Sequence, residues 1–225
     1  MKHRMVIGAA VAALMLTGSA YAQTAVTATS DLNIRSGPGP QYPVVGVINV
    51  DSQAGLDGCL EGSKWCRVSH NGVDGWAYSD YLIADYSGRE IIVTERPAEA
   101  SIPVVTYEGS SGTGAGAAVG TAGGVVAGAL IGGPIGAAVG GIAGATAGAT
   151  AGAAINPSPQ ARAYILENQV EPVYLEGEVV VGAGVPDTVV LREIPDYEYR
   201  YVNINGQPVL VEPNDRRIVY VVRDR

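Results

Sequence analysis

Short stretches of alternating polar and apolar residues fill the first part of the chain, and turn-forming residues separate them. Residues 31–35 alternate strictly, and residues 44–50 are rich in β-branched side chains, which favour strands. Between them Ser-Gly-Pro-Gly-Pro, at 36–40, forces an irregular turn. The pair Asn71-Gly72 is typical of a two-residue hairpin. Together these signals predict a small β-barrel over residues 24–86.

The last part of the chain, residues 156–225, combines one helix signal with several strand signals. Ser158 is a good N-cap and Pro159 a good first helical residue, so a helix is expected to run to Asn168. Strand-like runs occupy residues 179–181, 188–191, 199–204, 207–211 and 217–222. Asn205-Gly206 lies between two of them and predicts a second hairpin. The segment is therefore expected to form a small α+β unit, a helix plus a β-meander.

A glycine at every fourth position marks the middle of the chain, residues 112–155. These glycines are residues 112, 116, 120, 124, 128, 132, 136, 140, 144, 148 and 152. On a helix this spacing places them along one ridge, where two backbones can approach closely. The break at Gly132-Gly133-Pro134 predicts two helices, residues 113–131 and 135–155. Each would be roughly 30 Å long, which matches the thickness of a bilayer core.

This glycine-rich segment resembles the glycine-zipper hairpins of bacterial envelope proteins. The resemblance implies association with a membrane, or self-association of the chain, through Gly112–Gly152. A flexible spacer is an alternative, because Ala and Thr dominate the other positions and membrane insertion would be weakly driven. A β-rich assembly is a third interpretation. The preceding residues 87–111 are interpreted as a linker, although residues 90–94 could add an edge strand.

Charge and targeting signals narrow the range of functions. The 225 residues carry a formal net charge of −8, which argues against broad nucleic-acid binding because phosphate contacts need clustered Lys and Arg. Residues 1–22 have a positive start, a short apolar run and a small-x-small end, the pattern of a signal peptide. The protein is therefore expected in the periplasm or cell envelope. In that oxidising compartment Cys59 and Cys66 are expected to form a disulfide across a hairpin.

The barrel region resembles the bacterial SH3-like domains, known as SH3b domains. The opening of the family is matched by Leu-Asn-Ile-Arg-Ser-Gly-Pro-Gly at 32–39 and by Tyr-Pro-Val-Val-Gly at 42–46. Its closing strands are matched by Trp-Cys-Arg-Val at 65–68 and by residues 75–82. The resemblance covers about a quarter of the chain. It implies an SH3-like β-barrel that binds peptides or cell-wall glycopeptide, with peptidoglycan or an envelope peptide as partner, and that performs no chemistry.

Aromatic side chains and one arginine are the candidate ligand-binding residues of the barrel: Arg35, Tyr42, Trp65, Trp76, Tyr78 and Tyr81. Tyr and Trp offer a broad, stiff contact area to sugars and extended peptides. Each candidate also has a structural interpretation. Trp65 and Trp76 lie at alternating strand positions and could fill the core, and Arg35 could clamp the turn at 36–40 instead of anchoring an acidic ligand group.

The end of the chain resembles a small domain of unknown function in bacterial envelope proteins. The residues that carry this resemblance are 186–191, 205–211 and 217–220. It implies a structural unit and transfers no activity. We predict no catalytic residue, metal site or cofactor: His70 beside a hairpin turn is expected to be a surface residue, and the glycine-rich run lacks the Gly-Lys-Ser/Thr ending of a phosphate-binding loop.

The sequence thus predicts a mainly β, exported, non-enzymatic cell-envelope protein whose SH3-like module binds cell-wall glycopeptide or a peptide partner. One alternative is a purely structural assembly protein with a flexible Gly/Ala spacer and no ligand. Another is a hydrolase that uses two carboxylates, although no pair such as Asp80 with Asp85 is singled out by its surroundings.

Overall fold

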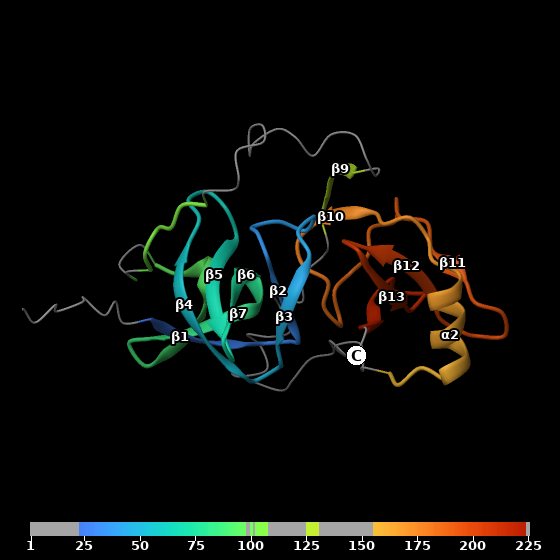
Figure 1. Cartoon of the computed structure of the whole chain (residues 1–225), viewed down its shortest axis with the longest axis horizontal. Helices are drawn as coiled ribbons and strands as arrows, with labels where there is room; N and C mark the ends of the chain where they lie inside the picture. The colour runs from blue at the N-terminus through green and yellow to red at the C-terminus, as the bar shows by residue number, and fades with distance from the viewer. Residues whose placement is uncertain (1–22, 98–99, 101, 108–124, 131–154, 224–225) are drawn as a thin grey trace, which may run out of the picture.

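The computed structural model describes residues 23–97, 100, 102–107, 125–130 and 155–223. Two folded parts are visible in Figure 1, one built from the blue and green strands and one from the orange and red elements. The expected signal peptide, residues 1–22, lies outside the described residues, as do residues 112–124 and 131–154 of the glycine-rich segment.

Eight antiparallel strands form the curled sheet of the first part, called the barrel below. Their order is β3-β2-β6-β5-β4-β1-β7-β8. They are β1 (Thr24–Ala28), β2 (Leu32–Arg35), β3 (Val44–Ile48), β4 (Gln53–Cys59), β5 (Trp65–His70), β6 (Val73–Tyr78), β7 (Leu82–Tyr86) and β8 (Arg89–Ile92). The edge strand β8 pairs with β7, so the strand signal in residues 90–94 produces a strand as far as Ile92, and Val93–Glu95 forms a 3-10 turn instead.

Local sequence explains the tight packing of β2, β5 and β6. Asn71 and Gly72 have φ angles of 49° and 79°, as the two-residue turn between β5 and β6 requires, which confirms the first hairpin prediction. A side chain at Gly75 would place its Cβ 2.5 Å from the carbonyl oxygen of Arg35. Glycine at this position therefore lets β6 approach β2 closely enough for the two strands to pair.

Two short 3-10 turns, Ser79–Tyr81 and Val93–Glu95, precede β7 and follow β8. Further along the chain, residues 102–107, called the strap below, return to the barrel. The Cys59 amide donates to the Pro103 carbonyl at 2.9 Å, and the Val105 amide donates to the Cys59 carbonyl at 3.0 Å. The strap thus lies along the end of β4 as a short parallel bridge. A Cβ at Gly58 would lie 2.5 Å from the Pro103 carbonyl oxygen, so only glycine admits the strap here.

The second part, called the C-terminal unit below, comprises residues 155–223. It contains α2 (Pro159–Glu167), β10 (Tyr174–Glu176), β11 (Arg192–Glu193), β12 (Arg200–Ile204), β13 (Gln207–Val211) and β14 (Ile218–Val221). Strands β11 to β14 form an antiparallel meander in chain order. The Ser158 hydroxyl accepts a hydrogen bond from the Ala161 amide, and Asn205 and Gly206 have φ angles of 54° and 79°. The predicted N-cap and the second hairpin are therefore confirmed.

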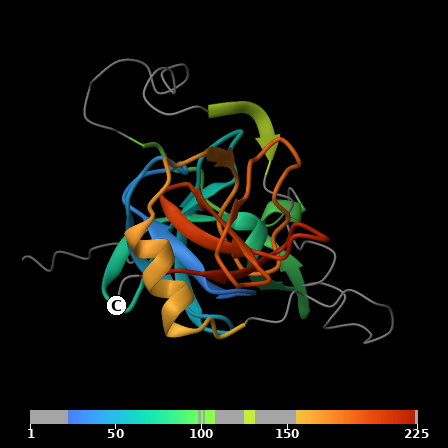
Figure 2. The same cartoon turned by 90° about the vertical axis from the view of Figure 1, so that its right-hand side faces the viewer.

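The meander is buried on both faces. One face, with Tyr201, Leu210 and Val219, packs under Ile165 of α2, which Figure 2 shows as the outer layer of this unit. The other face belongs to a single cluster of buried apolar residues that continues through residues 175–189 into the barrel. Alternation along β12 and β13 sends successive side chains to these two layers, as the period of two requires. In β14, where the register shifts opposite Leu210 and Val211, Val219 and Tyr220 both belong to the α2 layer.

Two strand predictions in the C-terminal unit are wrong. Residues 179–181 and 188–191 form loops, although Val179, Val180 and Val189 are buried. Glycines and a proline interrupt this stretch, and its backbone bonds individually to the meander instead of forming a continuous ladder. For example, the Gly182 amide donates to the Ile218 carbonyl at 2.7 Å. The apolar, β-branched residues of these two runs predict strands, but in the structure their side chains only fill space beside a sheet.

The helical hairpin predicted over residues 112–155 is not supported. In the part that is described, β9 (Val125–Leu130) is a strand that pairs in parallel with β10. Each glycine inside a helix costs about 1 kcal/mol relative to alanine, whereas adjacent valines such as Val125-Val126 favour an extended backbone. None of the helices in the described residues is long and apolar enough to cross a membrane.

Candidate functional site

Pairing between β5 and β6 gathers aromatic and charged side chains on one face of the barrel. Arg67 lies directly opposite Trp76, and Trp65 lies opposite Tyr78. Asp74 stands two residues before Trp76 and therefore points to the same side. This face changes along its length from buried aromatic rings at Trp65 and Tyr78 to exposed charges at Arg67 and Asp74.

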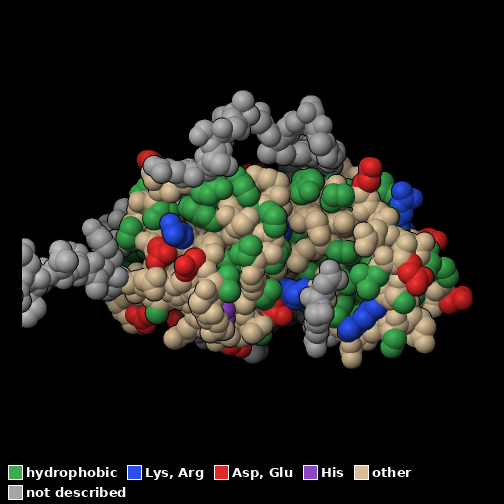
Figure 3. Space-filling model, viewed as in Figure 1, with side chains coloured by type: hydrophobic (Ala, Val, Ile, Leu, Met, Phe, Trp, Pro, Cys, Tyr) green, Lys and Arg blue, Asp and Glu red, His purple; other side chains and the backbone are tan. Residues whose placement is uncertain are grey.

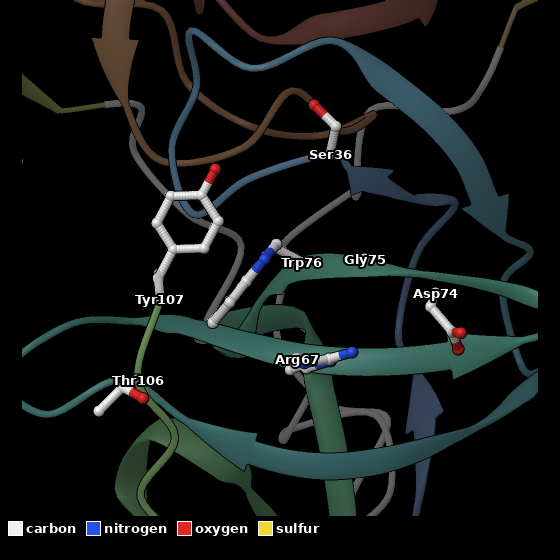
Figure 4. Close-up of a pocket in the computed structure, with 7 residues that line it drawn as sticks. All are labelled: Ser36, Arg67, Asp74, Gly75, Trp76, Thr106 and Tyr107. Carbon is white, nitrogen blue, oxygen red and sulfur yellow. The ribbon is translucent and has the colours of Figure 1, made fainter. Parts of the chain in front are cut away.

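A cleft of about 460 Å³ opens in the middle of this face. It is lined by Ser36, Arg67, Asp74, Gly75, Trp76, Thr106 and Tyr107. Figure 4 shows the ring of Tyr107 and the indole of Trp76 at one end, Asp74 at the other, and Arg67 between them. The cleft thus joins an aromatic wall from the strap and β6 to one positive and one negative side chain from β5 and β6.

The strap completes the aromatic wall with Tyr107. Its ring meets the Trp76 ring edge-on at 5.5 Å and 90°, and meets the Tyr42 ring at 5.8 Å and 77°. Such edge-to-face pairs are favourable beyond the apolar area they bury. Tyr42 is half-buried, and burial, followed by the neighbouring Tyr107 hydroxyl, raises the pKa of its phenol. Little of the Trp76 indole reaches the cleft, since the residue is 5% exposed.

The other aromatic candidates lie outside the cleft and are buried. Trp65 packs edge-on against Tyr78 at 5.4 Å, and Tyr78 in turn lies 6.3 Å from Tyr81. Burial, followed by the charge of Asp80, raises the pKa of Tyr78 and of Tyr81 above the usual phenol value. The Asp80 carboxylate itself is held by Lys64 at 2.9 Å. In this structure these three aromatic rings form the end of the barrel core.

Arg35 lies away from the cleft, at the contact between the barrel and the C-terminal unit, and is 1% exposed. Its Nη1 donates to the carbonyls of Pro40 at 2.9 Å and Tyr42 at 2.8 Å, and so fixes the turn that follows β2. Its Nε and Nη2 donate to the two carboxylate oxygens of Glu178 at 2.5 and 2.6 Å. One guanidinium therefore clamps a turn and also binds an acidic group, which comes from the same chain.

Asn33 and the Val179 amide also bind the Glu178 carboxylate, and Gln207 binds Asn33. The Asn33 amide donates to Glu178 Oε1 at 3.0 Å and to Gln207 Oε1 at 2.8 Å. The backbone amide of Val179 donates to Glu178 Oε1 at 2.8 Å. Asn33, Gln207 and Glu178 are all buried, so this polar network is shielded from water.

The disulfide prediction is confirmed. Cys59 and Cys66 are bonded and lie directly opposite each other on β4 and β5. Both are buried, at 1% and 0% exposed. The bond closes the hairpin at the end that also receives the strap, because Cys59 makes both backbone hydrogen bonds to it.

His70 and the acidic side chains are further groups that could carry chemistry among the described residues. His70 Nδ1 lies 2.8 Å from the Gln53 carbonyl and Nε2 lies 3.0 Å from the Asn71 amide nitrogen, beside a second, shallow hollow. Within the described ranges no three His, Cys, Asp or Glu side chains gather as a metal site would require. Acidic and basic side chains are scattered over the face in Figure 3 and do not form a patch of one charge.

Tyr107, Glu178, Arg67 and Asp74 are among the residues of these two sites that sequence reasoning missed. Tyr107 lay in the segment interpreted as a linker, and Glu178 lay beside a run of valines that suggested a strand. Arg67 and Asp74 are exposed charges on strands, which by themselves do not indicate a binding site. The hairpin at Asn71-Gly72 could have found this pair, since its register already places residue 67 opposite residue 76.

Comparisons with known proteins match both folded parts. Residues 30–83 match a family model described as Bacterial SH3 domain, and residues 164–223 match one described as Domain of unknown function (DUF1236). The chain is 37% identical over 67 residues to a Bacillus subtilis (strain 168) protein named "Putative N-acetylmuramoyl-L-alanine amidase YrvJ". That match covers 29% of this chain and 12% of the relative, so the chain spans only a small part of that protein. The resemblances inferred at both ends of the chain are therefore confirmed at the level of these two domains, whereas the glycine zipper is not shown.

Proposed function

We propose that this protein is a non-enzymatic component of the bacterial cell envelope that binds cell-wall glycopeptide in the cleft between β5, β6 and the strap. The observation that carries the proposal is the cleft itself, which combines two aromatic rings with one positive and one negative side chain. The matches to the Bacterial SH3 domain and to a protein named "Putative N-acetylmuramoyl-L-alanine amidase YrvJ" support the cell wall as the source of the ligand.

The chemistry of the cleft suits a peptide that bears both charges. Arg67 is half exposed and its Nε lies 3.6 Å from Asp57 Oδ2, a loose contact that leaves the guanidinium able to bind a ligand carboxylate. Asp74 is exposed on the same face and suits an ammonium group. Trp76 and Tyr107 offer apolar edges to the peptide or sugar between these charges. Cell-wall stem peptides carry carboxylates and amines together.

Sedimentation of the full chain with purified peptidoglycan tests this function. We expect the protein to pellet with the polymer at low salt, and Arg67→Gln and Tyr107→Ala to reduce the pelleted fraction several-fold. Arg89→Gln is the matched control, because it removes the same charge from an exposed site on β8, outside the cleft. Protein that stays in the supernatant would favour the purely structural alternative. Equal losses for Arg67→Gln and Arg89→Gln would remove the cleft from the proposal.

The absence of catalysis is tested in the same incubation. We expect no soluble glycopeptide to be released, because the cleft lining has no histidine to activate its hydroxyl groups and the two cysteines are joined in a disulfide. Release that disappears in Asp74→Asn would support the hydrolase alternative. Export and membrane association through the glycine-rich segment stay predictions, and fractionation of the envelope after expression tests both.

A further inference from the structure

A buried ion pair joins the barrel to the C-terminal unit. The side chains of Arg35 and Glu178 are 1% and 0% exposed, and the two residues are 143 positions apart in the chain. Their contact is bidentate, at 2.5 and 2.6 Å, which is the strongest geometry for an arginine and a carboxylate. A charge buried to this extent is tolerated only when its partner is present.

The barrel holds the donors of this contact in place through contacts of its own. The turn carbonyls of Pro40 and Tyr42 orient the guanidinium, and the β2 backbone sets Asn33 two residues from Arg35 on the same side of the strand. The amide of Asn33 then points to the same carboxylate oxygen that Arg35 Nη2 binds. Together Asn33 and Arg35 form a carboxylate receptor on the edge of the barrel that faces the C-terminal unit.

The C-terminal unit is shaped to fill this receptor. The Val179 amide donates a hydrogen bond to the Glu178 carboxylate and holds it in place. Gln207, at the start of β13, accepts a hydrogen bond from the Asn33 side chain. At the rim, Arg223 Nη1 lies 3.5 Å from the carboxylate of Asp31. Figure 1 shows β2 and β3 on the side of the barrel that adjoins the orange and red elements.

Apolar packing continues across the same contact. One cluster of buried residues includes Leu32 and Ile34 of β2 together with Leu175, Val179 and Val209 of the C-terminal unit. The polar network is therefore enclosed by a shared apolar core. Its carboxylate and guanidinium cannot regain water while that core is intact.

We propose that the C-terminal unit is the built-in partner of the barrel, with Glu178 as the ligand of the Asn33–Arg35 receptor, and that the barrel and the C-terminal unit unfold as one cooperative body. The rival arrangement is two independent modules joined only by the glycine-rich segment. The role of the C-terminal unit is then to neutralise and cover the charged side of β2 in the barrel. It does not depend on cell-wall binding in the cleft.

Cleavage of the connecting segment tests the proposal in the full chain. A protease recognition sequence is inserted after Gly116, the folded protein is cut, and the products are separated by size-exclusion chromatography. We expect the two fragments to elute together in equal amounts. Glu178→Gln keeps the side-chain shape but leaves Arg35 unpaired, and we expect it to raise the dissociation constant of the fragments at least about 30-fold.

The matched control is Glu171→Gln, which makes the same change at an exposed position of the same unit. Fragments of the unsubstituted chain that separate at micromolar concentration would overturn the proposal, as would equal behaviour of the two glutamine variants. Calorimetry of the uncut, unsubstituted chain keeps the test decisive if Glu178→Gln does not fold. One transition with equal calorimetric and van't Hoff enthalpies is expected, and two separate transitions would refute cooperative unfolding.

Discussion

Opening the Cys59–Cys66 disulfide should destabilise the barrel by an amount set by the length of the loop that it closes. The two cysteines are separated by seven positions, so the bond restricts a short hairpin loop in the unfolded chain. The chain-entropy relation for a loop of this length gives about 2.5 kcal/mol at 25 °C. This is a large fraction of the 5–15 kcal/mol by which domains are usually stable, so the loss is readily measured.

Urea unfolding followed by tryptophan fluorescence measures this loss. Trp65 and Trp76 are 6% and 5% exposed, so both report on barrel unfolding. The oxidised protein is compared with the same protein in reductant, which keeps both sulfur atoms and changes only the covalent bond. Cys59→Ala with Cys66→Ala is the second comparison, and we expect a somewhat larger loss because two buried sulfurs are removed.

The outcome distinguishes two origins of the stabilisation. A loss near 2.5 kcal/mol on reduction, with an almost unchanged slope against urea, supports restriction of the unfolded chain. A loss below about 1 kcal/mol would show that the hairpin and the strap hold the two strands together without the bond. Complete unfolding on reduction would show that the bond maintains the native barrel, and the entropic reasoning would then be wrong.

Two further predictions concern the strap and the buried tyrosines. Gly58→Ala places a methyl group against the Pro103 carbonyl, so we expect the strap to leave β4. The fluorescence emission of Trp76 should then shift to the red and peptidoglycan retention should fall. An unchanged emission spectrum would contradict this prediction. Burial raises the folded-state pKa of Tyr81 and Tyr78, so their contribution is complete below the unfolded value near 10 and is lost as the pH rises above it. Stability should therefore fall above pH ~10 by up to about 1.4 kcal/mol per pH unit for each tyrosine. Tyr81→Phe should reduce this slope in urea titrations, and an equal slope in the variant would exclude Tyr81 as its source.

Local signals in the sequence predicted the barrel well because its strands are short and its turns are specific. Asn71-Gly72 and Asn205-Gly206 define hairpins without reference to the remaining chain, and Ser158 defines a helix start in the same way. The cysteine pairing followed from the same hairpin logic. These features depend on backbone conformation over a few residues, and the amino acids that they require are few.

The candidate sites depended on contacts that no local pattern carries. Glu178 meets Arg35 across 143 residues, and Tyr107 reaches Trp76 only because the strap folds back over Gly58. The glycine period was the basis of the helical prediction, but a glycine at every fourth position does not itself make a segment helical. In the part that is described, β9 instead pairs with β10 as a strand. Periodicity alone does not decide between these two outcomes.

The ion pair between Arg35 and Glu178 has a consequence for how such chains can change over generations. The two family models divide this chain into modules that could be shuffled separately. A barrel that keeps Arg35 but receives a C-terminal unit without an acid at position 178 would bury an unpaired positive charge. A C-terminal unit that keeps Glu178 but joins a barrel without Arg35 would bury an unpaired negative charge. We therefore expect chains that combine these two modules to keep both charges of the pair or to replace both together.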